Sequence, residues 1–148
     1  MKASINWREK MEFAAEVREH GLVMDASKLA GGADKGPTPK ELVLVAICGC
    51  TGMDVVSYLR KSKTDLASLL VTAEAEQTKT HPKVFERVIV TFDAKGAASQ
   101  KAALIEAVDK SQTLYCGVSA MIAKACPISY RVLLNGETVH TGQAVFPN

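Results

Sequence analysis

Four cysteines carry the most reactive side chains of this chain, and two of them lie in settings that differ from each other. Cys50 lies within residues 49–56, Gly-Cys-Thr-Gly-Met-Asp-Val-Val, inside a long apolar stretch. Cys116 lies within residues 115–119, Tyr-Cys-Gly-Val-Ser, at a break between two helical patterns. Two thiols that face each other can form a disulfide and act as a two-electron redox couple. A lone buried thiol instead packs like a small hydrophobic side chain.

Residue types alone leave both readings of Cys50 open. It lies about three turns beyond the start of its predicted helix, outside the range of the helix dipole. An ionised Asp54, four residues on, disfavours the reactive thiolate of Cys50. Cys116 is better placed, because it precedes a predicted helix whose N–H groups can stabilise a thiolate, and Gly117 leaves its sulfur accessible.

The other two cysteines are expected to be core residues. Cys48 is turned roughly 200° from Cys50 on the same helix, among neutral side chains, and Cys126 precedes Pro127 at the start of a predicted strand. A zinc site built from all four cysteines is disfavoured, because none of them forms a C-x2–4-C pair. The three histidines are scattered along the sequence. We therefore expect no metal and no cofactor.

Length and charge indicate a soluble single-domain protein without a nucleic-acid or membrane partner. The 148 residues suit a single domain over residues 1–148, and the net charge of +2 is dispersed, which predicts no nucleic-acid partner. No apolar run reaches the ~20 residues of a membrane span, so no membrane association is expected. The first residues lack the apolar region of a signal peptide, which predicts a soluble, cytoplasmic protein with reduced cysteines.

The elements that position the cysteines can be predicted from local patterns. Residues 1–26 alternate like short strands, with a turn at residues 18–21, and residues 31–37 form a loop by composition. Thr38, Pro39 and Glu41 make a complete helix start, with Thr38 as the N-cap and Glu41 closing a capping box. The helix is predicted to run to about Lys61. Because residues 42–56 are apolar on every face, we expect it to be buried on most sides.

The second half of the chain returns to strands and short helices. Residues 70–78 and 84–94 alternate as a hairpin, residues 98–111 and 118–124 have helical spacing, and residues 128–134 and 139–145 flank Asn135-Gly136, a strong hairpin signal. Strands that come in antiparallel pairs predict an α+β fold.

These motifs resemble the OsmC/Ohr superfamily, in its branch with Gly-Cys-Thr-x-Met-Asp-Val-Val. The resemblance extends over residues 31–42, 49–56, 81–85 and 110–119. It implies antiparallel β-sheets wrapped around long central helices in an intertwined homodimer. It also implies that Cys50 is peroxidatic and Cys116 resolving. The expected function is thiol-dependent reduction of organic hydroperoxides in oxidative-stress defence, with an external dithiol as reductant.

The resemblance also indicates where activating residues belong. Peroxidase branches of the family have an Arg in the first hairpin and a Glu in a Pro-Glu-x-Leu helix start. Spacing places Phe13 and Lys40 at those two positions. Arg18, or Arg8, and Glu41 are therefore the candidates for the two roles, and a shifted hairpin register is required for the arginine. The alternative is a non-catalytic dimeric protein that binds a small apolar ligand or senses oxidants.

Overall fold

The computed structural model describes residues 1–147, and the chain divides into two compact units. The first unit comprises Met1–Val43, and the second begins at Leu44. The single domain over residues 1–148 stays a prediction.

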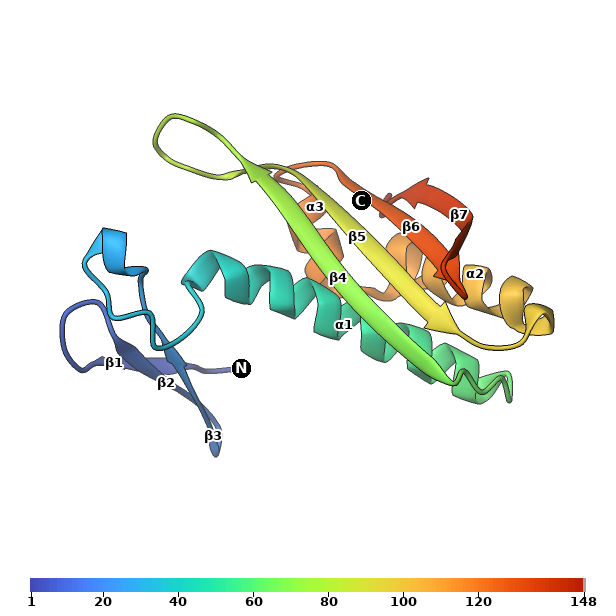
Figure 1. Cartoon of the computed structure of the whole chain (residues 1–148), viewed down its shortest axis with the longest axis horizontal. Coiled ribbons are helices and arrows are strands. Elements are labelled where there is room, and N and C mark those ends of the chain that lie inside the picture. The colour runs from blue at the N-terminus through green and yellow to red at the C-terminus, as the bar shows by residue number, and fades with distance from the viewer. Residues whose placement is uncertain (148) are drawn as a thin grey trace. The chain divides into compact units, whose positions relative to one another are not determined.

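The first unit contains a three-stranded antiparallel sheet, as the alternating pattern predicted. Its strands β1 (Ser4–Trp7), β2 (Phe13–Val17) and β3 (His20–Met24) are hydrogen-bonded in that order (Figure 1). The β2–β3 turn is shorter than predicted, and Arg18 adopts a φ of 59° there. A short 3-10 helix, η1 (Lys28–Ala30), follows β3.

The loop after β3 folds around the carboxylate of Asp25, which is 3% exposed. This carboxylate accepts hydrogen bonds from the backbone N–H groups of Ala26, Ala33 and Lys35, at 2.8, 2.9 and 3.2 Å. Gly32 is required within the loop, because a Cβ there would collide with the Ala26 carbonyl group and the Asp25 carboxylate. The loop predicted by composition is confirmed, and a buried anion organises it.

The long helix α1 (Pro39–Lys61) has the predicted bounds. At its start, one carboxylate oxygen of Glu41 accepts hydrogen bonds from the Thr38 N–H at 2.7 Å and from the Thr38 hydroxyl at 2.8 Å. These two bonds lower the pKa of Glu41. The side chain of Glu41 thus satisfies a free N–H at the helix start, as expected for a capping residue.

The second unit contains a four-stranded sheet in the order β4–β5–β6–β7 (Figure 1). The hairpins β4–β5 and β6–β7 are antiparallel and confirm the two predicted strand pairs. Asn135 and Gly136 join the second hairpin with φ values of 56° and 87°, as its turn requires. The strands are β4 (Ser68–Gln77), β5 (Phe85–Lys95), β6 (Ile128–Leu134) and β7 (Glu137–Gln143).

The central strands β5 and β6 run parallel, a pairing that the local patterns did not reveal. A parallel pair needs a long crossover, and here helical segments between the two strands provide it. The larger sheet is therefore mixed where fully antiparallel sheets were expected, and the α+β class is confirmed. The crossover consists of η2 (Ala98–Gln100), α2 (Lys101–Lys110), the π-helical segment η3 (Ser111–Tyr115) and α3 (Gly117–Ala123).

One face of this sheet forms the core with the helices. Alternate residues of β5 and β6 are buried on that face, and α1 and α2 contribute apolar side chains to the same cluster. The fully buried members include Val88, Val90, Phe92, Val132, Ile47, Val55, Leu104 and Val108. The alternation of buried residues follows the period of two expected for strands with one face covered.

The prediction that α1 is buried on most sides is wrong for the single chain. Its buried residues form one stripe, namely Ile47, Thr51, Val55 and Leu59. On other faces Val45 and Met53 are 61% and 75% exposed, because the core covers only one side of the helix. By length and composition alone, α1 is long and apolar enough to cross a membrane, a test that the core helix of a soluble protein also passes.

Candidate functional site

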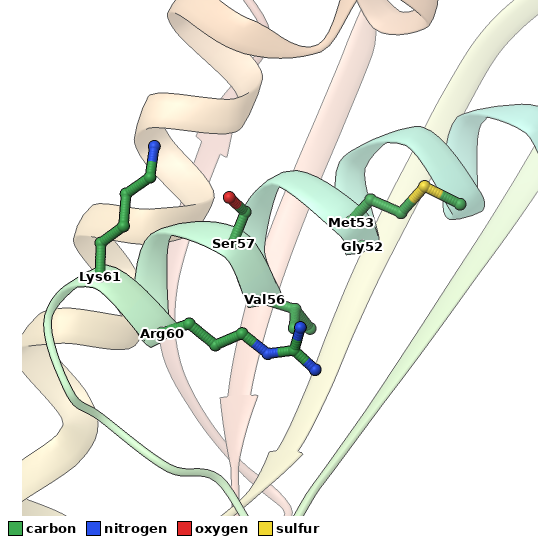
Figure 2. Close-up of a pocket in the computed structure, with 6 residues that line it drawn as sticks. All are labelled: Gly52, Met53, Val56, Ser57, Arg60 and Lys61. Atoms are coloured by element: carbon green, nitrogen blue, oxygen red, sulfur yellow. The ribbon is translucent and has the colours of Figure 1, made fainter.

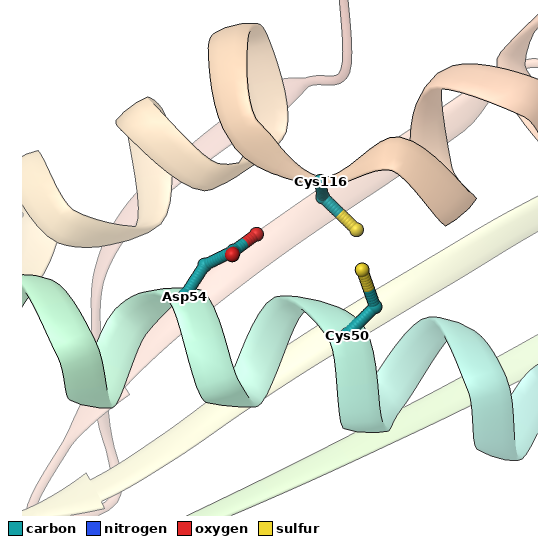
Figure 3. Close-up of side chains that lie close together, drawn as sticks. All are labelled: Cys50, Asp54 and Cys116. Atoms are coloured by element: carbon teal, nitrogen blue, oxygen red, sulfur yellow. The ribbon is translucent and has the colours of Figure 1, made fainter.

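Helix α1 and the junction between η3 and α3 bring two sulfurs and a carboxylate together. Cys50 and Asp54 are four residues apart on α1 and therefore share a face. Cys116 ends η3 and is the N-cap of α3. The Sγ atoms of Cys50 and Cys116 and a carboxylate oxygen of Asp54 all lie within 4.8 Å of one another, and the two sulfurs point toward each other (Figure 3).

The two thiols of this site differ in burial. Cys116 is fully buried, and the Ser119 N–H donates to its Sγ at 3.4 Å. Burial raises the pKa of Cys116 to about 11, although hydrogen bonding from Ser119 acts in the opposite direction. The predicted N–H donor is thus present, but desolvation outweighs it. Cys50 is half-buried and is the more accessible of the two thiols.

A chain of side-chain hydrogen bonds lies behind the site and ends at Asp54. The Ser111 hydroxyl donates to Asp54 Oδ2 at 3.0 Å, and Ser111 Oγ also lies 2.7 Å from Thr51 Oγ1. Because Ser111 has a single hydroxyl proton, Thr51 must be the donor in that second bond. Gln112 Nε2 in turn donates to Thr51 Oγ1 at 2.8 Å. With an ionised Asp54, every bond in the chain therefore runs toward the carboxylate.

The π-helical segment η3 places this chain of donors. Ser111 and Gln112 are both fully buried where α2 gives way to η3, and Cys116 follows one residue after η3 ends. A π-turn widens the helix locally and is frequent at functional sites. The sequence patterns did not single out Ser111, Gln112 or Thr51 as residues of the site. A buried polar residue within an apolar helix was the one available signal.

Several surface hollows are lined in part by α1. One of about 330 Å³ adjoins the site through Asp54 and is also lined by Ser57, Tyr58, Lys61 and Tyr115. A larger one of about 570 Å³ is lined by Gly52, Met53, Val56, Ser57, Arg60 and Lys61 (Figure 2). The larger hollow includes neither sulfur nor Asp54. We therefore regard the smaller one as the approach to the site, despite its size.

The remaining candidate residues do not all join this group. Arg18 and Glu41 lie in the first unit, and the Glu41 carboxylate is engaged with Thr38. Their activating role stays a prediction. Cys48 is half-buried and Cys126 is buried, burial raises the pKa of both thiols, and neither belongs to the cluster around Asp54. All four cysteines are free.

Comparison with known proteins identifies the family. The OsmC-like protein family matches residues 32–131, which include both cysteines of the site. The chain belongs to the OsmC-like family. Protein YhfA of Escherichia coli strain K12 is 34% identical to it over 131 residues, which are 88% of this chain and 95% of that protein.

Solved structures support the same OsmC-like fold. A hypothetical protein from Aquifex aeolicus VF5 has a TM-score of 0.75 and 26% identity, over 90% of this chain and 96% of that one. An organic hydroperoxide resistance protein OsmC from Legionella pneumophila has a TM-score of 0.63 and 16% identity, over 90% and 94%.

Proposed function

We propose that this OsmC-like protein, as a member of the Gly-Cys-Thr branch, is a thiol-dependent peroxidase that reduces organic hydroperoxides. The observation that carries the proposal is the approach of the Cys50 and Cys116 sulfurs within 4.8 Å. A disulfide needs paired sulfurs at about 2 Å, so the two sulfurs must move closer to each other to form it.

The proposed reaction has three balanced steps. The Cys50 thiolate attacks the distal oxygen of the hydroperoxide, the O–O bond breaks, and the alkoxide takes a proton to leave as an alcohol. Cys50 is now a sulfenic acid, oxidised by two electrons. The Cys116 sulfur then attacks the Cys50 sulfur, which forms the disulfide and releases water. An external dithiol reduces that disulfide by thiol–disulfide exchange and is itself oxidised.

Burial supports the assignment of the two roles. The attacking thiol must meet a hydroperoxide from solution, and Cys50 is the half-buried member of the pair. Cys116 is fully buried and has a raised pKa, which suits a thiol that reacts only after Cys50 has been oxidised beside it. The rings of Tyr58 and Tyr115 line the adjoining hollow and offer an apolar surface to the organic part of a hydroperoxide.

Stopped-flow oxidation of the reduced protein by cumene hydroperoxide tests the proposal. We expect oxidation far faster than that of free cysteine, and complete loss of this rate in Cys50→Ser. Cys116→Ser should keep the first step and accumulate a sulfenic acid that dimedone traps. A wild-type rate equal to that of free cysteine would reject the proposal.

The matched controls are Cys48→Ser and Cys126→Ser. Both remove a free thiol outside the cluster, so both should retain the rate and form the disulfide. Arg18→Ala and Glu41→Gln test the two activating residues that family resemblance suggests. A lowered rate with unchanged disulfide formation is the expected result for each. Unchanged rates in both variants would remove these residues from the mechanism.

We further propose that the protein is a cytoplasmic homodimer. The exposed apolar side chains of α1, including Val45 and Met53, need cover that one chain does not provide. Sedimentation equilibrium at low micromolar concentration should give a dimer. Met53→Lys should weaken it, whereas a stable folded wild-type monomer would contradict this part of the proposal.

One observation favours a second function, a non-catalytic dimeric protein that binds an apolar ligand or senses oxidants. A carboxylate oxygen of Asp54 lies within 4.8 Å of the Cys50 sulfur, and an anion there disfavours the reactive thiolate. Near-equal peroxide reactivity of the wild type and Cys50→Ser, with a ligand retained in native mass spectrometry, would favour this function.

A further inference from the structure

Asp54 has no part in the peroxidase reaction, yet it completes the cluster with Cys50 and Cys116. A carboxylate next to two thiols raises the cost of forming a thiolate, since like charges would then lie within 5 Å. A divalent cation reverses this relation, because it attracts all three groups at once. We propose that the reduced protein binds one Zn²⁺ ion through Cys50 Sγ, Cys116 Sγ and a carboxylate oxygen of Asp54.

The geometry suits zinc. Tetrahedral zinc, with Zn–S bonds of about 2.3 Å and Zn–O bonds of about 2.1 Å, holds its ligand atoms roughly 3.6–3.8 Å apart. The three ligand atoms here already lie within 4.8 Å of one another. Cys50 and Asp54 project from one face of a rigid helix, and Cys116 faces them from another element (Figure 3). Side-chain rotations are therefore sufficient to close the site.

The hydrogen bonds around the cluster resemble the outer shell of a metal site. The Ser111 hydroxyl holds Asp54 through Oδ2, which leaves Oδ1 to bind the ion. The Ser119 N–H donates to Cys116 Sγ, a bond that favours a metal-bound thiolate. The chain from Gln112 through Thr51 to Ser111 fixes the position of the Ser111 hydroxyl, and Ser111 in turn orients Asp54 toward the sulfurs.

The ligand set selects the class of metal. Two thiolates favour a soft or borderline cation, and a single carboxylate suits zinc better than it suits Cu(I). Three protein ligands leave the fourth tetrahedral position for water, which can enter because Cys50 and Asp54 are only half-buried. Binding of Zn²⁺ displaces one proton from each thiol to solvent and changes no oxidation state. The spacing of the four cysteines disfavours a zinc site built from cysteines alone, whereas this site takes a carboxylate as its third ligand.

Zinc binding and disulfide formation are mutually exclusive. A disulfide between Cys50 and Cys116 consumes both sulfur ligands, so oxidation releases the ion, and bound zinc occupies the thiol that a peroxide would attack. The metal site itself does not depend on the proposed peroxidase function, because it needs only the reduced cluster.

The test uses the metal-free, reduced, full-length protein under argon, titrated with Co²⁺ as a spectroscopic probe. We expect one Co²⁺ per chain, with a thiolate-to-cobalt charge-transfer band and the intense visible bands of four-coordinate cobalt. Addition of one equivalent of Zn²⁺ should abolish these bands. Absence of a charge-transfer band, or a stoichiometry unaffected by Cys50→Ser, would overturn the proposal.

Variants distinguish a site with three ligands from one in which the two thiols alone bind the metal. Cys50→Ser should abolish the charge-transfer band, and because Cys50 is half-buried this change leaves the core intact. Asp54→Asn should weaken Zn²⁺ binding at least 10–100-fold, the loss typical even of outer-shell partners. The controls Cys48→Ser and Cys126→Ser should bind like the wild type. Equal affinity of Asp54→Asn and the wild type would reject Asp54 as a ligand.

The outcome is distinguishable from that of the peroxidase test. Cobalt spectra are recorded without any peroxide, and peroxide kinetics are recorded in the presence of a chelator. A protein that binds Zn²⁺ but oxidises at the rate of free cysteine retains the metal site and loses the proposed function. A protein that oxidises rapidly but binds no Zn²⁺ retains the proposed function and loses the metal site.

Discussion

Asp25 and Asp54 are both held by hydrogen bonds, one in each compact unit, but different donors hold them. Three backbone N–H groups use both oxygens of Asp25, which is 3% exposed. A single side-chain hydroxyl, that of Ser111, holds Asp54 through Oδ2, and two sulfurs lie within 4.8 Å of that carboxylate. Asp25 is buried among its donors, whereas the half-buried Asp54 is open to a ligand.

The hydrogen-bond donors around each carboxylate indicate its role, structural for Asp25 and functional for Asp54. Backbone donors cannot be exchanged, and they tie Asp25 to the conformation of one loop. Side-chain donors can be tuned without changing the backbone, and they aim Asp54 at reactive neighbours. Substitutions in the first unit should therefore change stability, and substitutions at Asp54 should change thiol reactivity.

The largest expected effect is the loss of stability when a side chain is added at Gly32, next to Asp25. In Gly32→Ala the new Cβ would collide with the Ala26 carbonyl group, which is backbone and cannot move away cheaply. We expect the free energy of unfolding of the first unit to fall by about 3 kcal/mol or more. The fluorescence of Trp7, the single tryptophan, in β1, reports this unit in thermal unfolding.

The matched control for that change is Gly49→Ala in α1. A Cβ at Gly49 meets nothing within 4 Å. Alanine favours a helix over glycine by about 1 kcal/mol, so this variant should unfold no more easily than the wild type. Similar destabilisation by both substitutions would remove the argument that the Asp25 loop is tightly packed.

A smaller effect is expected when the charge of Asp25 is removed and its shape is kept. Burial alone would raise the pKa of Asp25, but the N–H groups of Ala33, Lys35 and Ala26 outweigh it, so the pKa is lowered. Since the folded pKa lies below the unfolded value of 3.8, this carboxylate stabilises the fold above that pH. Its contribution is lost as the pH falls through the folded pKa.

Asp25→Asn should therefore lower the unfolding temperature of the first unit at neutral pH and flatten its decline in acid. Thermal unfolding followed by Trp7 fluorescence between about pH 3 and pH 7 measures both changes. Asp34→Asn is the control, because Asp34 is exposed in the same loop and its φ of 61° suits asparagine. An acid transition unchanged by Asp25→Asn would assign it to other groups.

The elements that could be predicted from the sequence are those with local signals. Thr38, Pro39 and Glu41 marked the start of α1, and Asn135-Gly136 marked the β6–β7 turn. The approach of Cys50 and Cys116 was expected from the family resemblance of their two segments. The helix start and the turn needed no knowledge of distant contacts, whereas the cysteine pair was expected only because of the resemblance.

The features that were missed depend on pairing across the chain. The parallel β5–β6 ladder joins strands with a helical crossover between them, so no turn signal marks it. Ser111 meets Asp54 from a position 57 residues away in sequence. The π-turn of η3 that buries Gln112 has no sequence signature of its own. The exposure of α1 was also missed, because the core of one chain covers only one side of this helix.

The smallest expected effect on stability, and the most specific on reactivity, belongs to Asp54→Asn. Asparagine keeps an acceptor for Ser111, so the free energy of unfolding should change by less than about 1 kcal/mol. Removal of the charge within 4.8 Å of the Cys50 sulfur relieves a repulsion of about 1 kcal/mol even at the dielectric constant of water. The thiolate of Cys50 should therefore form more readily.

We expect Cys50 of metal-free Asp54→Asn to be alkylated by iodoacetamide roughly five-fold or more faster than in the wild type, since 1 kcal/mol corresponds to about that factor. Mass spectrometry of peptides with Cys50 measures the rate, and Cys48 in the same digest is the internal control. Asp25→Asn should leave this rate unchanged while it lowers stability. If Asp54→Asn instead unfolds as readily as Asp25→Asn and leaves the rate of Cys50 unchanged, the two carboxylates have the same structural role, and the contrast between them fails.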